Sequence, residues 1–382
     1  MDFALNKAQR DIQKAARQFA KGEFDKELAI ELEEKHEFPT AIWKKAAEEG
    51  FIGLHYPEEY GGSGFGVLEN TLVVEEFCRQ DSGIGAALMT VDFSSENVLR
   101  YGTHEQKERY LIPVAEGEAI SAGAITEPEH GSDITQMATT AVRDGDEWVI
   151  NGVKTFITNA GLADYYVVIC QTDSEAGHRG QSMIMVEKDA EGIEVSSVGH
   201  KMGIRMIPTG EVAFKNTRVP ATNLLGEENR GFYQILGFFD ESRIETAAQA
   251  VGTAQGAFDR ALEYVKGREQ FGQKIAQFQA TQHKLAEMAT KIELARLITY
   301  KAAWAADQGK PDTKITAMAK YYACNAAVQV ADEAIQLLGG YGYMTEFEVE
   351  RFYRDVRITE IYEGTREIQK NIIAGAVIGK LK

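Results

Sequence analysis

The feature that most constrains this chain is a change in hydrophobic period that occurs twice along its 382 residues. Residues 1–119 and 227–382 show helical spacing, as in Ala41–Glu49, after which Gly50 favours a helix end. Residues 120–226 contain short apolar runs separated by turn residues, which is typical of strands. The pattern predicts a mainly α protein with a central β-domain: an N-terminal helical domain, a middle antiparallel sandwich or barrel, and a C-terminal helical bundle.

Individual elements can be predicted inside these regions. Trp148–Ile150 and Val153–Ile157 flank Asn151-Gly152, a pair that favours the type I′ turn of a β-hairpin. The stretch 279–306 has no Pro or Gly, and its apolar residues recur at helical intervals, so we expect a long helix with one packed face. Further strands are expected over residues 165–170, 182–186 and 211–214.

Charge and cysteine content exclude several classes of function. The formal net charge is −17, which disfavours nonspecific binding to nucleic acid or to an anionic membrane, although a few arginines suffice for a phosphorylated cofactor. Cys78, Cys170 and Cys324 form no CxxC pair, so we predict no disulfide framework and no metal site. No signal peptide or membrane span is apparent, and the expected location is the cytoplasm, or the mitochondrial matrix if a transit peptide has been removed.

Each motif taken singly has an ordinary explanation. The run Gly62–Gly66 follows helical sequence and is better interpreted as a turn than as a dinucleotide loop. The loop Thr126–Asp133 offers hydroxyls and free amides for a phosphate or a ring edge, but it is also an ordinary polar loop. Phe156 stands beside hydroxyl residues, a combination that can bind a flat heterocycle but that also occurs in an ordinary half-buried strand. The acidic residues of Phe239–Arg243 favour a helix N-terminus. Glu363 precedes Gly364, which permits a sharp turn that aims the carboxylate into a cavity, although a lone Glu is usually solvated.

Together these segments resemble the acyl-CoA dehydrogenase family, with short-chain (butyryl-CoA) dehydrogenases as the nearest type. The resemblance runs from Phe3 to Ile373 and is densest in four segments: Thr126–Asp133, Arg268–Gly272, Leu338–Gly342 and Ile361–Thr365. It implies the same three-part fold and an FAD bound between the β-domain and the C-terminal bundle, partly against a neighbouring subunit. It also implies an acyl-CoA substrate, a homotetramer, and electron-transfer flavoprotein as electron acceptor.

The resemblance also implies roles for individual residues. Ile125 and Thr126 are expected to contact the flavin, with Thr158 at its N5 edge and Phe156 packed on the ring. The complete implied FAD set is Ile125, Thr126, Ser132, Phe156, Thr158, Arg268, Phe271, Gln279, Gln336, Gly340, Thr365 and Glu367. The implied substrate set is Ser132, Phe239, Asp240, Ser242, Arg243, Tyr362 and Gly364.

The implied reaction is α,β-dehydrogenation of a short, branched or alicyclic acyl-CoA. Glu363 removes the α-proton, its backbone amide stabilises the developing enolate, and the β-hydrogen leaves as hydride to the flavin. Alternatives on the same fold are an acyl-CoA oxidase and a flavin monooxygenase, although loss of the base would be expected in the latter. A non-redox acyl-CoA-binding protein is a further alternative.

Asp92 falls in the segment where the family lines its acyl pocket, and an acidic side chain is unexpected in an apolar pocket. We expect it either to face solvent or cap a helix, which its residue type favours, or to touch the acyl group. In the second case it would bind a polar substituent or act as a second base on a ring substrate. Glu241 and Arg366 are further departures from the residues expected at their positions, and dicarboxylic acyl groups and a reductive direction stay open.

Overall fold

The computed structural model describes residues 4–379, so Phe3, where the family resemblance begins, lies outside the described residues. The N-terminal region is helical, and its α-helices are α1 Lys7–Glu23, α2 Lys26–Lys35, α3 Thr40–Glu48, α4 Val67–Gln80, α5 Ser82–Met89, α6 Ser95–Tyr101 and α7 His104–Ala115. The strands that follow are β1 Ser121–Ala124, β2 Thr140–Asp144, β3 Glu147–Thr158, β4 Tyr165–Gln171, β5 Gln181–Glu187, β6 Ile193–Ser197, β7 Thr209–Pro220 and β8 Leu224–Leu225. The remaining elements are α8 Gly231–Gly267, β9 Glu269–Gln270, β10 Gln273–Lys274, α9 Gln279–Asp307, α10 Thr313–Leu338, α11 Val349–Val356 and α12 Arg366–Ile378.

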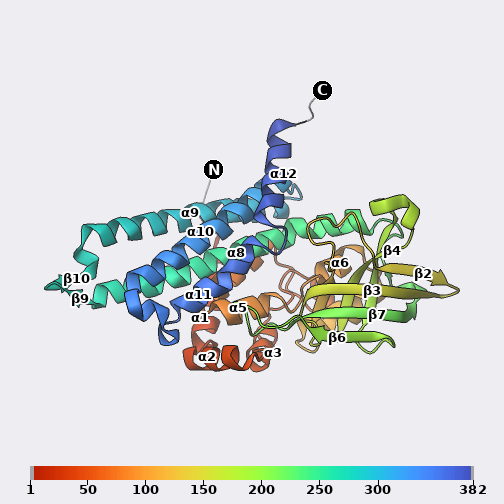
Figure 1. Ribbon diagram of the computed structural model, residues 1–382, viewed down its shortest axis with the longest axis horizontal. Coiled ribbons are helices and arrows are strands. Elements are labelled where there is room, and N and C mark those ends of the chain that lie inside the picture. Colours follow the sequence, from red (N-terminus) through yellow and green to blue (C-terminus); the bar gives the residue numbers. More distant parts are fainter. Residues whose placement is uncertain (1–3, 380–382) are drawn as a thin grey trace.

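The predicted fold class is confirmed, because helices flank a central sheet in the chain order that the hydrophobic period indicates. Figure 1 shows α8, α9 and α10 lying side by side, with the sheet at one end and the β9–β10 ribbon at the other. The long helix predicted over 279–306 is α9, and α3 ends just before Gly50, whose φ is +75°. The domain boundaries at 119/120 and 226/227 stay predictions. Among the described residues, no helix is both long and apolar enough to cross a membrane.

The sheet is mixed, which corrects the prediction of a purely antiparallel domain. Its strand order is β6-β7-β3-β2-β4-β5-β8, with β1 beside β4. Both β1 and β2 run parallel to β4, whereas the other pairings are antiparallel. The strands predicted over 165–170 and 182–186 are β4 and β5, and 211–214 lies within β7. β4 is buried along its whole length, which explains why its sequence is a continuous apolar run.

The hairpin predicted at Asn151-Gly152 is wrong, because β3 continues through this pair without turning. Gly152, at φ +152°, occupies an irregularity where the pairing of β3 with β7 shifts register. The tight turn instead lies between β2 and β3 at Gly145, whose φ is +62°. A glycine next to an asparagine can therefore mark a bulge as well as a turn.

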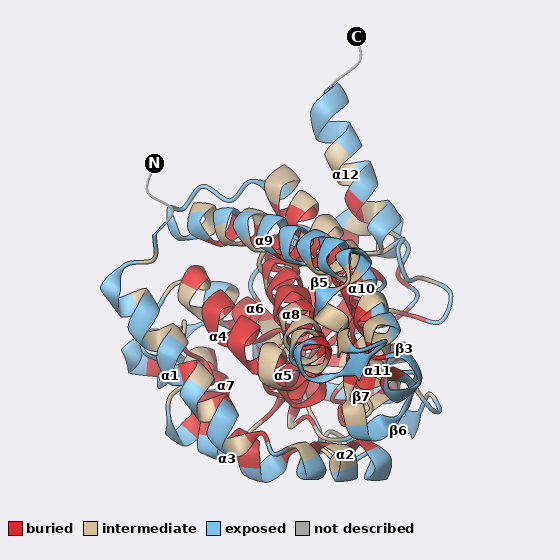
Figure 2. Ribbon diagram, turned by 90° about the vertical axis from the view of Figure 1, so that its left-hand side faces the viewer, coloured by how far each residue is buried: buried red, intermediate tan, exposed pale blue. Residues whose placement is uncertain are grey.

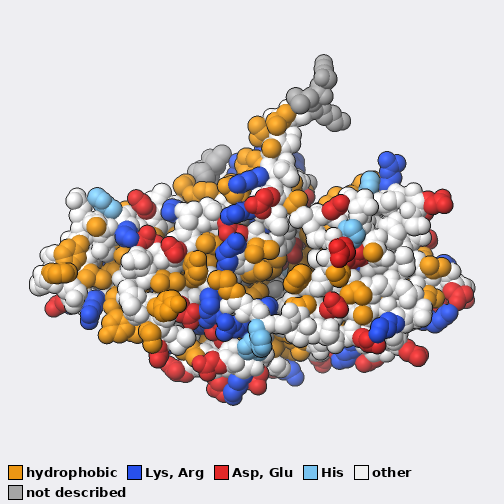
Figure 3. Space-filling view, viewed as in Figure 1, with side chains coloured by type: hydrophobic (Ala, Val, Ile, Leu, Met, Phe, Trp, Pro, Cys, Tyr) orange, Lys and Arg blue, Asp and Glu red, His pale blue; other side chains and the backbone are white. Residues whose placement is uncertain are grey.

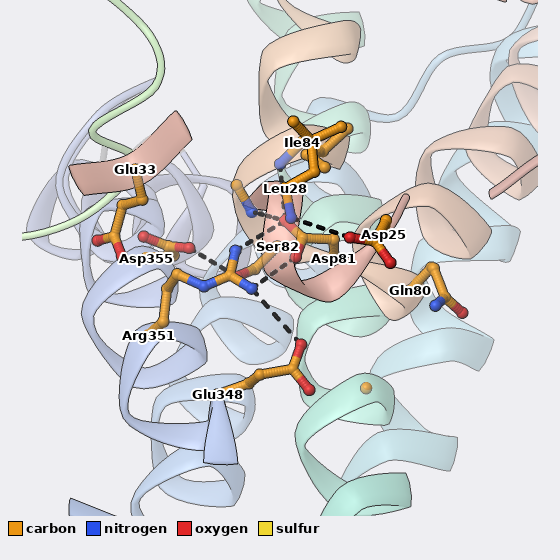
Figure 4. Close-up of polar contacts among 12 residues, drawn as sticks. Asp25, Leu28, Glu33, Gln80, Asp81, Ser82, Ile84, Glu348, Arg351 and Asp355 are labelled. Carbon is orange, nitrogen blue, oxygen red and sulfur yellow. Dashed lines mark hydrogen bonds and ion pairs between the residues drawn. The ribbon is translucent and has the colours of Figure 1, made fainter. Parts of the chain in front are cut away.

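A buried ion-pair cluster joins the N-terminal helices to the C-terminal bundle (Figure 4). Arg351 on α11 donates to both carboxylate oxygens of Asp81, at 2.8 and 2.6 Å. Asp81 also caps α5 by accepting from the amides of Gly83 and Ile84. Beside it, Ser82 Oγ donates to Asp355 at 2.6 Å. The bidentate geometry fixes α5, and with it the segment that carries Asp92, against the bundle.

α8 forms the centre of the molecule, and Figure 2 shows its buried surface surrounded by the other helices. It packs against α4, α9 and α10 through small and apolar side chains. A helix so enclosed can present functional groups to an interior site with little positional freedom.

Candidate active site

Glu363 sits at a sharp turn of the backbone just before α12. Its φ is +53° and that of Gly364 is +86°, so two successive residues adopt the left-handed conformation. A non-glycine residue in this region costs free energy, and such residues concentrate at functional sites. The turn directs the Glu363 carboxylate towards α8.

The Glu363 carboxylate is held by Ser242, a residue of the predicted substrate set on α8. Ser242 Oγ donates to Glu363 Oε2 at 2.5 Å. Burial raises the pKa of Glu363 above its ordinary value, and the bond from Ser242 and the charges of Arg243 and Lys320 oppose that rise. A carboxyl group whose basicity is raised by burial, yet kept oriented by a hydrogen bond, is suited to accept a proton from carbon.

The carbonyls around Glu363 are fixed by Lys320 and Gln369. Lys320 Nζ donates to the carbonyls of Tyr362, at 2.8 Å, and Gly364, at 2.7 Å. Gln369 Nε2 donates to the carbonyls of Glu363, at 3.2 Å, and Gly364, at 3.0 Å. Among the described residues, nothing accepts a hydrogen bond from the Glu363 amide. The turn therefore presents a free N–H and a carboxylate from the same residue.

Sequence reasoning missed both Lys320 and Gln369. Lys320 is fully buried on α10, between Ala319 and Ala323 on the buried side of that helix. A lysine within an apolar helix face was the available signal, because a buried ammonium group needs acceptors. Gln369 is also buried, but nothing in its sequence context distinguishes it.

Most of the remaining predicted substrate residues lie near this turn. Phe239, Asp240 and Arg243 lie more than two turns inside α8, so the interpretation of the acidic residues as helix N-terminal is wrong. The Arg243 guanidinium lies 5.4 Å from the Phe239 ring centre and 3.7 Å from Asp240. The Tyr362 hydroxyl donates to Gln249, also on α8. Ser132 is exposed on the loop before β2 and is not in contact with this group.

The residues of the β-domain that were predicted to contact the flavin lie together. The Thr155 amide donates to the Thr126 carbonyl at 2.8 Å, which places the Ile125-Thr126 segment beside the end of β3. Phe156 lies where the register of β3 shifts, has a φ of +56°, and exposes 67% of its surface. An exposed aromatic ring beside the hydroxyls of Thr126 and Thr158 fits a flat heterocycle such as a flavin.

A buried ion pair holds the Ile125-Thr126 segment on its interior side. Lys154 Nζ donates to Glu127 at 2.9 Å and to the Ile125 carbonyl at 3.0 Å. Glu127 also accepts from the amides of Ala138 and Thr139, at 2.6 and 2.8 Å. The pair is almost fully buried and ties the loop 125–139 to β3. Sequence analysis did not identify it.

The other predicted FAD residues lie elsewhere in the chain. Arg268, Gln336 and Gly340 line a groove of about 610 Å³ beside the β9–β10 ribbon, at the end of the molecule opposite the sheet (Figure 1). Phe271, at φ +52°, exposes 94% of its surface there. Figure 3 shows hydrophobic side chains gathered at this end. Gln279 begins α9 and is exposed, Thr365 caps α12 through the Ile368 amide, and Glu367 is exposed beside Arg366. One chain therefore does not bring the two halves of the predicted set together.

Asp92 does not cap α6, and its side chain is half-buried on an interior cavity, which fits the alternative of a contact with the acyl group better than a position fully in solvent. The N-cap of α6 is Ser94, and Asp92 lines a cavity of about 20 Å³ with Glu245 of α8. Burial raises the pKa of Asp92 to about 7, against the lowering effect of nearby backbone amides. His55, Asp92 and Glu96 place ligand-type atoms within 4.8 Å of one another. This grouping was not predicted, because His55 is far from Asp92 in the sequence.

The comparisons with known proteins agree with this geometry. Profiles of the N-terminal, middle and C-terminal domains of acyl-CoA dehydrogenases match residues 6–118, 122–217 and 229–378. A short-chain-specific acyl-CoA dehydrogenase of Clostridium acetobutylicum is 42% identical over 99% of this chain and 100% of its own length. A caffeyl-CoA reductase–Etf complex subunit of Acetobacterium woodii is 42% identical over 97% of this chain and 98% of its own.

The solved structures give the same result. Butyryl-CoA dehydrogenase of Megasphaera elsdenii superposes with a TM-score of 0.94 and 39% identity, covering 99% of this chain and 100% of that one. Both the recognition made from the sequence and the FAD cofactor are thereby confirmed. The chain belongs to the acyl-CoA dehydrogenase family, the FAD-dependent oxidoreductases that act on CH–CH groups.

Proposed function

We propose that this protein dehydrogenates a short, branched or alicyclic acyl-CoA to its enoyl-CoA, with Glu363 as the base that removes the α-proton. The supporting observation is that Glu363 offers two groups from one fixed turn. Its carboxylate is oriented by Ser242. Its amide is free, while the neighbouring carbonyls are bound by Lys320 and Gln369.

These two groups match the demands of the reaction. The α-proton of a thioester is very weakly acidic, so a base succeeds only when the carbonyl oxygen is stabilised as negative charge develops. The Glu363 amide would donate to that oxygen while its carboxylate accepts the proton. Bound FAD supplies the acceptor for the β-hydrogen. Arg243 and Asp240, which precede Glu245 on α8 and lie 3.7 Å from each other, would hold the CoA portion.

The predicted FAD-binding residues lie in separate parts of one chain, which supports an oligomer. Thr126, Phe156 and Thr158 would bind the flavin of one subunit, and Ser132 its pyrophosphate. Arg268, Phe271 and Gln279 would reach the same cofactor from a neighbouring subunit, and Gln336, Gly340, Thr365 and Glu367 would line its adenosine half. The distance between these groups within one chain, and the exposed aromatic residues near the β9–β10 ribbon, support this arrangement (Figures 1 and 3). A homotetramer satisfies it.

Electron-transfer flavoprotein is the proposed electron acceptor, and the cytoplasm the proposed location. The relative from Acetobacterium woodii bears the name of an Etf complex and of a reductase. The same site can run in the reductive direction, since a base that removes the α-proton can also return it. The relatives described above are bacterial, which supports the cytoplasm and gives no support for a mitochondrial matrix.

Asp92 is the proposed contact to the acyl group. Its place on a cavity shared with Glu245, one turn beyond Ser242 on α8, supports this role. There it would bind a polar substituent or act as a second base on a ring substrate. Asp92→Asn tests whether Asp92 takes part: unchanged turnover of every active thioester would remove Asp92 from the mechanism.

The proposed function is tested by anaerobic mixing of the purified holoenzyme with butyryl-, isovaleryl-, glutaryl- and cyclohexanecarboxyl-CoA. We expect at least one to bleach the visible absorbance of the oxidised flavin, and Glu363→Gln to abolish the bleaching. Rapid oxygen consumption would instead indicate an oxidase. A yellow protein that none of the thioesters bleaches would contradict the proposal, and a colourless preparation would favour a non-redox binding protein.

A further inference from the structure

The direction of the acyl group can be inferred from α8, on the basis of the proposed function. Ser242 holds the base, Phe239 lies about one turn before it, and Glu245 about one turn after it. One turn corresponds to about 5 Å along the axis, on the same helix face. If Phe239 and Asp240 face the CoA portion, the acyl group extends towards Glu245.

The far end of this path is acidic. Asp92 and Glu245 line one cavity with apolar residues of α4, α5 and the Phe51-Ile52 segment. Asn70 Nδ2 donates to Glu245 Oε1 at 2.6 Å. Among the described residues, none that lines this cavity is basic. A cavity of about 20 Å³ admits a single water-sized group, so the acidic side chains lie close to whatever fills it.

A third carboxylate, that of Glu96, lies within 4.8 Å of Asp92, and one of its oxygens has no hydrogen-bond partner among the described residues. Glu96 is 4% exposed, and the oxygen without a partner is Oε2. Its Oε1 lies 3.8 Å from His55 Nε2, but burial lowers the pKa of His55 to about 4, so the ring carries no charge at neutral pH. Arg100, whose guanidinium charge acts on Glu96, is paired with Glu241. Among residues 4–379, no lysine or arginine is ion-paired with Asp92, Glu96 or Glu245, so none is placed to compensate an additional negative charge here.

We propose that Asp92, Glu96 and Glu245 determine substrate specificity, by excluding acyl groups that end in a carboxylate and admitting uncharged ones. Burial raises the pKa of Asp92, Glu96 and Glu245, so this site already resists negative charge. A terminal carboxylate placed among these side chains would add a charge in a poorly solvated site and would lose its own hydration. An uncharged group of the same shape meets neither cost, and a hydrogen-bond donor can be accepted by the carboxylates. The dicarboxylic class, which the sequence left open, is thereby removed from the candidate substrates.

The test compares two thioesters that differ only in terminal charge: glutaryl-CoA and its terminal amide. The dissociation constant of each is measured on the holoenzyme by the change that binding causes in the flavin spectrum. We expect glutaryl-CoA to bind at least about tenfold more weakly than the amide. In Asp92→Asn/Glu245→Gln the ratio should fall to about threefold or less, whereas Glu116→Gln, which removes an exposed charge just after α7, should leave it unchanged.

Equal binding of the two thioesters by the unmodified enzyme would overturn the proposal, and so would a ratio that the acidic variants do not change. If the double variant fails to fold, Glu96→Gln and Glu245→Gln are measured singly. Failure of the proposed function gives a different result: no thioester then bleaches the flavin, although the binding ratio can still be measured.

Discussion

Ser242 Oγ donates a hydrogen bond of 2.5 Å to Glu363 Oε2, which links the central helix directly to the proposed base. This bond favours the ionised carboxylate, and burial acts against it. Ser242→Ala should therefore raise the pKa of Glu363. We expect the acid limb of the pH profile of kcat/KM for flavin reduction to move up by about one pH unit. Ser242→Thr, which keeps the hydroxyl, is the control. An unmoved acid limb in the alanine variant would mean that this bond does not tune the base.

Lys320 is expected to act as a positioning residue. Lys320→Met removes the two bonds that fix the carbonyls of Tyr362 and Gly364. The Tyr362 carbonyl would lose its partner, whereas the Gly364 carbonyl keeps its bond from Gln369, so the loss of stability should be about 1–3 kcal/mol. Loss of the fixed turn should also lower kcat at least about tenfold with less effect on KM, because a small misplacement of the base slows proton transfer. Stopped-flow reduction measures both. Lys370→Met, on α12, is a control at an exposed lysine. A lower melting temperature with unchanged kcat would reduce Lys320 to a purely structural role.

The buried Lys154–Glu127 pair should control flavin retention. Lys154→Met leaves Glu127 as an uncompensated buried charge and frees the Ile125 carbonyl, which should destabilise the protein by about 3–5 kcal/mol. We expect weaker FAD binding, measured as flavin released on dilution. Lys154→Met/Glu127→Leu removes both charges and should recover much of the stability. If the double variant is as unstable as the single one, packing rather than the unpaired charge explains the loss.

Asp92 should make stability depend on pH. Its native pKa of about 7 lies above the ordinary value of 3.8, so between these two values the folded state binds more protons than the unfolded state. The free energy of unfolding then falls as pH rises through this window. Asp92→Asn should flatten the fall and be more stable than the parent at pH above about 8. Denaturant unfolding of both proteins at a series of pH values measures this. Parallel profiles would show that Asp92 titrates as it does in the unfolded chain.

The sequence predicts the layers of this fold better than its local exceptions. Hydrophobic period identified α9, β4 and the overall order of helices and sheet, because burial of a face acts over many residues. It misassigned Asn151-Gly152, since turn and bulge demand the same backbone freedom. The positive φ of Phe156 could not be predicted, because partner strand β7 imposes the register shift.

In the candidate site, too, some residues could be predicted from the sequence and others only from the fold. Glu363 and Ser242 come from recognisable segments, whereas Lys320 and Gln369 act through backbone carbonyls that only the folded turn brings near them. The Asp92 environment depends on His55, Glu96 and Glu245, which come from separate elements. A single sequence contains no signal for such contacts.

The central claim, that Glu363 removes the α-proton, is tested most directly by solvent exchange. A 3-thia-acyl-CoA has no hydrogen on the β-position, so it can be deprotonated but not oxidised. Incubated with the holoenzyme in deuterated water and followed by mass spectrometry, it should gain deuterium at the α-carbon with the unmodified enzyme and with Asp92→Asn, and not with Glu363→Gln. Exchange that persists in Glu363→Gln, or disappears in Asp92→Asn alone, would contradict the account.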